Sequence, residues 1–220
     1  EVLRLIQAYR MRGHQAAQLD PLGLWKRPAP ADLSINHYGL TNADLDTTFR
    51  AGDLYIGKEE ASLREILESL QQTYCRTIGA EFTHITDSEQ RQWFQQRLES
   101  VRGRPEFSAD VQAHLLERVT AGEGLEKYLG TKYPGTKRFG LDGGEAMVPA
   151  LEQVIKRGGA LGVDEIVFGM AHRGRLNTLA AVMGKPYKAI FHEFQGGSTV
   201  PSDIEGSGDV KYHMGASSDR

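Results

Sequence analysis

A short basic turn holds the residues of this sequence that are best suited to chemistry. His172, Arg173 and Arg175 surround Gly174, directly after the apolar run 165–170. An arginine guanidinium can bind a carboxylate through two parallel charge-assisted hydrogen bonds, and a histidine can donate to a carbonyl oxygen or transfer a proton near neutral pH. A helix that starts after the turn would add its dipole to the attraction for an anion. The turn therefore predicts a site for an anionic substrate. The alternative is that both arginines form structural salt bridges and that His172 is a half-buried structural histidine with its hydrogen bonds satisfied.

A second histidine could join this turn. His213 follows the glycine- and serine-rich segment 206–209, which could bring it toward His172. The alternative is that His213 is a structural residue, as a lone histidine more often is. Residues 136–144 form another basic, glycine-rich turn, which either contacts an anion or simply exposes its charges to solvent.

Composition restricts the possible classes of protein. Of the 220 residues, 40% are hydrophobic and 25% are charged, as in ordinary soluble globular proteins. The net charge of −3 gives no general attraction to nucleic acid or to an anionic membrane, so neither is expected as a partner. The single cysteine, Cys75, excludes an intrachain disulfide, favours a reducing compartment and is expected to be a buried apolar side chain. No apolar run approaches the roughly 20 residues that cross a bilayer.

Several common enzyme motifs are absent. The sequence contains no phosphate-binding P-loop, no His-Glu-x-x-His helix and no Gly-x-Ser-x-Gly elbow. The segment 122–124 lacks the third glycine of a dinucleotide-binding motif and lies in a helical pattern. Nucleotide hydrolysis, zinc hydrolysis and serine esterase chemistry therefore have no support.

Residues 1–119 are expected to form a mainly helical region. Apolar side chains recur there at helical spacing, and a serine or threonine followed three residues later by glutamate predicts a capped helix start. The expected helices cover 2–12, ending at Gly13, two segments that begin at the pairs Ser62–Glu65 and Thr86–Glu89, and a third that follows Ser108. The side chains expected to face inward in these helices are Leu3, Ile6, Tyr9, Leu63, Ile66, Leu67, Leu70, Tyr74, Trp93, Phe94, Leu98, Val101, Val111, Leu115, Leu116 and Val119.

Residues 120–220 are expected to begin an α/β domain. A helix over 145–156, with Met147, Leu151, Val154 and Ile155 inward, should end at the glycine pair 158–159. The run 165–170 is apolar and β-branched, which predicts a buried strand, and the basic turn and another helix follow it. This order is typical of a parallel, helix-covered sheet. Ligands of such sheets bind beyond the carboxyl ends of the strands, where the basic turn lies.

Several segments together resemble, in order and spacing, the thiamine-diphosphate-dependent 2-oxoglutarate dehydrogenase component over essentially the whole chain. The segments are 5–10 with 12–14, 20–24, 72–75, 78–81 with 84–85, 137–139, 169–177 and 208–215. The resemblance implies an amino-terminal fragment, in which a helical region (1–119) precedes the truncated start of the first thiamine-enzyme α/β domain (120–220). It also implies that the parent enzyme is a homodimer.

The resemblance implies oxidative decarboxylation of 2-oxoglutarate in the tricarboxylic acid cycle. In this family the cofactor adds to the 2-oxo carbon, carbon dioxide leaves, and the succinyl group passes to the lipoyl domain of dihydrolipoamide succinyltransferase. The active-site histidines of the family match His172 and His213, and its substrate-binding arginine matches Arg173. 2-Oxoglutarate has a second carboxylate that pyruvate lacks, so these three side chains are expected to bind it.

The implied cofactors are thiamine diphosphate and magnesium. The family binds both through a Gly-Asp motif and a following Asn, downstream of the segment 211–215, and this sequence ends at Arg220 before such a motif. No metal ligand is therefore expected in this chain, and the fragment alone is expected to be inactive. The expected compartment is the cytoplasm of a bacterium or the mitochondrial matrix of a eukaryote. Two alternatives stay open: a noncatalytic module that binds a carboxylate or phosphate, and a relative specific for 2-oxoadipate.

Overall fold

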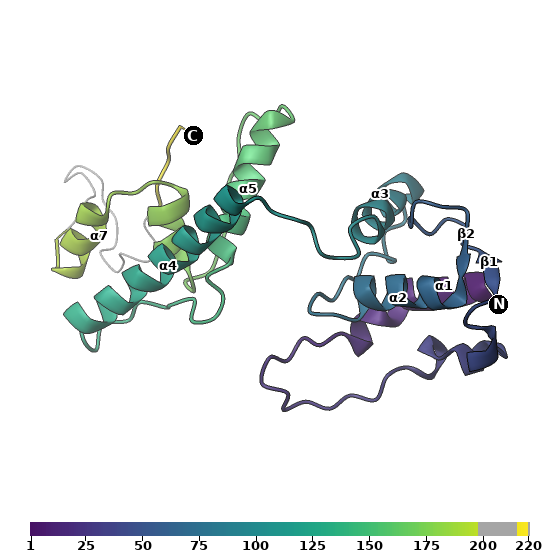
Figure 1. Cartoon of the computed structure of the whole chain (residues 1–220). Helices are drawn as coiled ribbons and strands as arrows, with labels where there is room; N and C mark the ends of the chain where they lie inside the picture. Colours follow the sequence, from purple (N-terminus) through teal and green to yellow (C-terminus); the bar gives the residue numbers. More distant parts are fainter. Residues whose placement is uncertain (198–214, 220) are drawn as a thin grey trace. The chain divides into compact units, whose positions relative to one another are not determined.

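The computed structural model describes residues 1–197 and 215–219, which form two compact units, Glu1–Glu106 and Phe107–Arg220 (Figure 1). The domain boundary expected after residue 119 falls inside a long helix of the second unit, α4 (Ala109–Lys132). Among the described residues, no helix is both long enough and apolar enough to cross a membrane.

The first unit combines α-helices, short 3₁₀-helices and a small sheet. Strands β1 (Thr48–Arg50) and β2 (Glu60–Ser62) pair antiparallel, with Phe49 opposite Ala61. The other elements are α1 (Val2–Arg12), η1 (Gly13–Ala16), η2 (Ala31–Leu33), η3 (Ile35–Tyr38), η4 (Asn42–Asp44), α2 (Leu63–Tyr74) and α3 (Ser88–Glu99). The predicted helix over 2–12 is confirmed.

The core of the first unit lies where α1 and α2 pack together. Leu5 and Ile6 of α1 and Leu70 of α2 are fully buried, and the periodicity of apolar residues predicts the last two. Gly13 ends α1 directly against α2, and a Cβ atom there would overlap the Cβ of Tyr74. The absence of a side chain at Gly13 therefore allows the two helices to approach closely.

Side-chain caps fix where three helices begin. Ser62 and Ser108 accept hydrogen bonds from backbone N–H groups in the first turns of α2 and α4, as predicted. The predicted cap of α3, Thr86, is wrong. Asp87 takes this role, because its carboxylate accepts from Glu89 N at 2.9 Å and from the next backbone N–H at 3.1 Å.

A buried ionic network ties α1 to α3. Arg10 is 1% exposed; its Nε donates to Glu99 Oε1 at 2.7 Å, and its Nη1 donates to both carboxylate oxygens of Asp53 at 2.9 Å. The Tyr74 hydroxyl donates to Glu99 Oε1 at 2.7 Å, and Tyr55 N donates to Oε2 at 3.0 Å. Burial, followed by the neighbouring Glu99 charge, raises the pKa of the Tyr74 hydroxyl. Glu99 is thus a buried carboxylate whose charge is offset by donors from Arg10, Tyr55 and Tyr74.

The buried side of α3 carries this network, and the prediction from apolar spacing is confirmed there only for Leu98, which packs against the core. Trp93 is 52% exposed, Phe94 39% and Val101, just after the helix, 41%, while Gln95 and Glu99 are buried. The spacing of apolar residues predicts a buried face made of hydrophobic side chains only. The buried Arg10 instead requires a carboxylate opposite it, so α3 buries Glu99. Elsewhere, the predicted inward residues that are exposed are Leu3, Val111, Leu116 and Val154.

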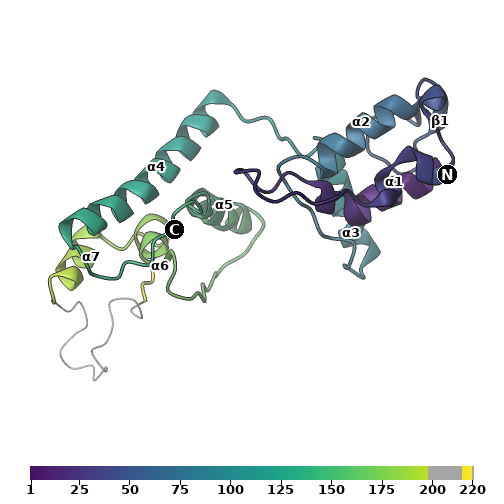
Figure 2. The same ribbon diagram turned by 90° about the horizontal axis from the view of Figure 1, so that it is seen from below.

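The second unit packs its helices against α4. Its other elements are α5 (Met147–Ala160), α6 (Arg175–Asn177), the π-helical turn η5 (Thr178–Val182) and α7 (Tyr187–Phe194). Leu125 of α4 packs with Leu176 of α6 and Ile190 of α7, and Figure 2 shows these two elements beside α4. Val148 of α5 packs with Val182 of η5. The predicted helix around 145–156 is confirmed, although it runs through its glycine pair to Ala160.

The strand predicted over 165–170 is not observed. The described part of the chain contains one sheet, the antiparallel pair β1–β2 of the first unit. A strand needs a hydrogen-bonded neighbour, and no described segment of the second unit supplies one, which leaves Val167 84% exposed. The described fold is therefore mainly helical with a small antiparallel sheet.

Candidate functional site

The basic turn predicted to do chemistry is held in shape by backbone hydrogen bonds. Arg175 N donates to His172 O at 3.1 Å, and Gly174 N donates to Phe139 O at 2.8 Å. Gly174 has a φ of +74°, and a Cβ atom there would overlap the Leu141 side chain. Left-handed backbone and close packing both require glycine at this position.

Both predicted substrate-binding residues of the turn lie at the surface, beside the segment 139–141. The ring centroids of His172 and Phe139 are 4.1 Å apart, with an interplanar angle of 40°. Arg173 Nη1 donates to the carbonyl oxygen of Gly140. A guanidinium carries five N–H donors, so this contact orients Arg173 while other donors can still bind a carboxylate.

Arg175 is used differently from Arg173. Its Nη1 donates to Met170 O at 3.0 Å, and its side chain lines a cavity of about 760 Å³ beside the segment 165–170. Among the described residues, neither arginine forms an ion pair; both donate to backbone carbonyls. Within these residues, backbone carbonyl oxygens rather than carboxylates hold both side chains.

A buried carboxylate lies behind the turn. Glu126 of α4 is 7% exposed, and its oxygens accept from Leu141 N at 2.9 and 2.8 Å and from Asn177 Nδ2 at 2.7 Å. Asn177, 1% exposed, also donates to Gly122 O at 3.1 Å. Neither Glu126 nor Asn177 was predicted from the sequence as a site residue. The available signal was a charged residue directly after Leu125, inside the buried stripe of a helix.

The turn 136–144 packs against the basic turn. Its segment 139–141 makes the contacts with residues 172–174, an arrangement that sequence did not predict. At its end, Gly143 N donates to the Glu145 carboxylate, and this hydrogen bond lowers the pKa of that carboxyl group. Residues 139–141 thus form one wall of the candidate site.

His213 and the glycine-rich segment before it lie outside the described residues. The approach of His213 to His172 therefore stays a prediction. Within residues 1–197 and 215–219, no group of three or more His, Cys, Asp or Glu side chains could hold a metal ion.

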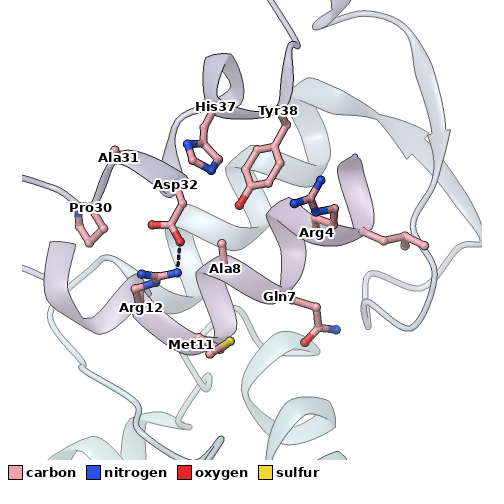
Figure 3. A pocket seen from close by; sticks show the side chains of 11 residues that line it. Arg4, Gln7, Ala8, Met11, Arg12, Pro30, Ala31, Asp32, His37 and Tyr38 are labelled. Carbon is pink, nitrogen blue, oxygen red and sulfur yellow. Dashed lines mark ion pairs between the residues drawn. The ribbon is translucent and has the colours of Figure 1, made fainter.

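A separate cavity of about 720 Å³ lies in the first unit, between α1 and the segment that contains η2 and η3 (Figure 3). Arg12 forms an ion pair with Asp32 there, and the Arg4 guanidinium lies 5.9 Å from the centroid of the Tyr38 ring. Burial, and then the Asp32 charge, raises the pKa of the Tyr38 hydroxyl. Since Arg12 is already paired, this cavity is less suited to an anionic substrate than the turn that carries Arg173.

Comparison with known proteins shows what this chain is similar to. No protein-family model matches the chain. Curated proteins that match 99% of it are dehydrogenase E1 components. Each is a 2-oxoglutarate dehydrogenase E1 component: the chain is 71% identical to that of Azotobacter vinelandii over 218 residues, 54% identical to that of Brucella anthropi over 219 and 52% identical to that of Brucella ovis over 219. The chain spans 22–23% of the length of these relatives. The resemblance seen in the sequence is thereby confirmed.

Proposed function

We propose that the complete protein catalyses the oxidative decarboxylation of 2-oxoglutarate in the tricarboxylic acid cycle, as an oxidoreductase that passes succinyl groups to lipoamide. The observation that carries the proposal is the 71% identity over 218 residues to a 2-oxoglutarate dehydrogenase E1 component. The proposed partner is the lipoyl domain of dihydrolipoamide succinyltransferase, and the proposed assembly is a homodimer. The relatives are bacterial, which favours a cytoplasmic location.

We assign the substrate-binding roles to His172, Arg173 and His213. Arg173 lies at the surface with one nitrogen fixed by Gly140 O, so its remaining donors can take one carboxylate of a 2-oxo diacid. His172, held against Phe139, can donate to a carboxylate or carbonyl oxygen. His213 is proposed to complete the donor set and, with His172, to serve in catalysis.

The described residues contain no group of three or more His, Cys, Asp or Glu side chains that could hold a magnesium ion. No step through thiamine diphosphate is therefore assigned to them. We propose that the ligands for thiamine diphosphate and magnesium belong to the greater part of the enzyme that this chain does not span. Calorimetry should accordingly find weak or no binding of thiamine diphosphate to the 220-residue chain; tight, magnesium-dependent binding would refute this assignment.

We also propose that 165–170 is a strand of a parallel, helix-covered sheet in the complete protein, and that residues 120–220 begin the thiamine-enzyme domain. Two observations support the proposed strand. The segment 165–170 is apolar and β-branched, and a cavity of about 760 Å³ lies beside it, which neighbouring strands could fill. Protection of the backbone amides of 165–170 from hydrogen exchange in the complete enzyme is the expected result. Rapid exchange there would show that no sheet forms.

The function is tested by carbon dioxide release from 2-oxoglutarate, 2-oxoadipate and pyruvate with the full-length enzyme, thiamine diphosphate and magnesium. We expect 2-oxoglutarate to have the highest kcat/KM, and His213→Ala to lower its turnover sharply. His37→Ala, an exposed histidine of the first unit, is the matched control and should leave turnover unchanged. Faster reaction with 2-oxoadipate would indicate the 2-oxoadipate relative, and no release from any substrate would indicate a noncatalytic module.

A further inference from the structure

Glu126 is a buried carboxylate that accepts hydrogen bonds from Leu141 N and Asn177 Nδ2. Among the described residues, no lysine, arginine or histidine forms an ion pair with it, yet it is 7% exposed. A buried charge is costly unless donors surround it, and here the donors are Leu141 N and Asn177 Nδ2. The exposed neighbour Glu123, by contrast, forms a surface ion pair with Lys127.

The two donors come from the two segments that form the candidate site. Leu141 follows Phe139 and Gly140, which contact His172 and Arg173. Asn177 lies in the short helix that begins at the end of the basic turn. Glu126 therefore joins the segment that contacts His172 and Arg173 to the short helix that directly follows them.

Gly140 fits this arrangement because it has no side chain. A Cβ atom there would lie 2.6 Å from Glu126 Oε2 and 2.8 Å from Asp142 Oδ2. The Gly140 backbone thus packs directly against the Glu126 carboxylate. The carbonyl oxygen of Gly140 accepts a hydrogen bond from Arg173 Nη1. A shift of the carboxylate would move the acceptor that orients Arg173.

We propose that Glu126 is a positioning residue: through the segment 139–141 it sets the orientation of Arg173 and His172 toward a carboxylate of the substrate. This inference rests on the proposed function. A role in packing alone would be served by any residue that fills the space, whereas positioning requires an acceptor oxygen where the two donors meet. Glutamine keeps one such oxygen, and alanine keeps none.

The test compares Glu126→Ala, Glu126→Gln and the control Glu123→Ala in the full-length enzyme. Because misplacement of a binding group by about 1 Å can cost about 100-fold, Glu126→Ala should lower kcat/KM for 2-oxoglutarate by up to about that factor, mainly through KM. Glu126→Gln should recover most of this loss, and Glu123→Ala should match the wild type. Equal kinetics for the two alanine variants would overturn the proposal.

A double-mutant cycle separates positioning from general damage. If Glu126 acts through Arg173, Glu126→Ala should cause little further loss in an Arg173→Ala background. If the falls in kcat/KM of the two single variants multiply in the double variant, Glu126 does not act through Arg173, and the proposal is overturned. If Glu126→Ala fails to fold, Gly140→Ala is the second test, because its methyl group displaces the Glu126 carboxylate without removing it. Gly140→Ala should then show the same rise in KM. An unchanged KM would again overturn the proposal.

Hydrogen exchange makes the failure of this inference distinguishable from a failure of the function. The Leu141 amide should be protected in the wild-type enzyme and should exchange faster in Glu126→Ala, whatever reaction the enzyme catalyses. Unchanged protection would overturn the positioning role even if 2-oxoglutarate is the substrate. Absence of carbon dioxide release by the wild type, with Leu141 exchange faster in the variant, would instead refute the proposed function.

Discussion

The Phe139 ring lies against the His172 imidazole, with 4.1 Å between their centroids, although the two residues belong to different turns. Phe139 also has a positive φ, at +46°, which it shares with Arg102 and Asp142 among the described non-glycine residues. Residues in this region of the backbone are uncommon and persist where the surrounding structure fixes them. Gly174 N donates to the Phe139 carbonyl oxygen. The basic turn therefore holds Phe139 in this backbone conformation, and the Phe139 ring in turn contacts His172 of the same turn.

Phe139→Ala should therefore reduce activity more than stability. Removing the ring frees the His172 imidazole, and the half-buried position limits the packing that is lost. We expect kcat/KM for 2-oxoglutarate to fall about tenfold, with a small change in melting temperature. Phe107→Ala, a more exposed phenylalanine of the same unit, is the control. Wild-type kinetics for Phe139→Ala would show that this ring does not orient His172.

Glu99→Ala should strongly destabilise the first unit. The change leaves the buried guanidinium of Arg10 without its carboxylate and the Tyr74 hydroxyl without its acceptor. Breaking a buried ion pair in this way costs about 3–5 kcal/mol. Asp46→Ala, which removes an exposed pair with Arg64, should cost less than about 1 kcal/mol. Urea unfolding measures both values, and similar values would contradict the role of the network.

Local signals in the sequence predicted much of the first unit. The buried face of α2 follows from the spacing of Leu63, Ile66 and Leu70, and its start follows from the capping side chain of Ser62. These features depend on residues a few positions apart. The sequence alone is therefore sufficient for them.

Features that depend on distant partners could not be predicted in this way. The buried side of α3 is set by Arg10, which lies 89 residues from Glu99 along the chain. The contact of 139–141 with the basic turn joins segments 33 residues apart. Similarly, 165–170 has the composition of a strand, but a strand also needs a neighbour, which the described part of the second unit does not provide.

Cys75 should react slowly with alkylating reagents at neutral pH. Burial raises the pKa of its thiol from 9.0 to about 11, which lowers the thiolate fraction by about 100-fold at pH 8. As the pH rises, the thiol ionises in the unfolded chain before it ionises in the folded protein, which favours unfolding. The contribution of the buried, neutral thiol to the free energy of unfolding is therefore complete below pH 9 and is lost as the pH rises toward 11. Iodoacetamide labelling measured against pH should show a midpoint near 11, with Cys75→Ser as the unlabelled control. A midpoint near 9 would show that the thiol is not buried.

Gly174→Ala should disrupt the candidate site directly. Alanine at a φ of +74° costs about 1–2 kcal/mol in backbone strain, and its methyl group would overlap the Leu141 side chain. The hydrogen bond from Gly174 N to Phe139 O would then be lost, and the two turns would separate. Gly124→Ala, on the exposed side of α4 where the space around a Cβ atom is open, is the matched control. We expect the full-length Gly174→Ala enzyme to lose most of its carbon dioxide release while Gly124→Ala retains it. Equal activity of the two variants would show that the close packing of residues 139–141 on the basic turn is not needed for catalysis.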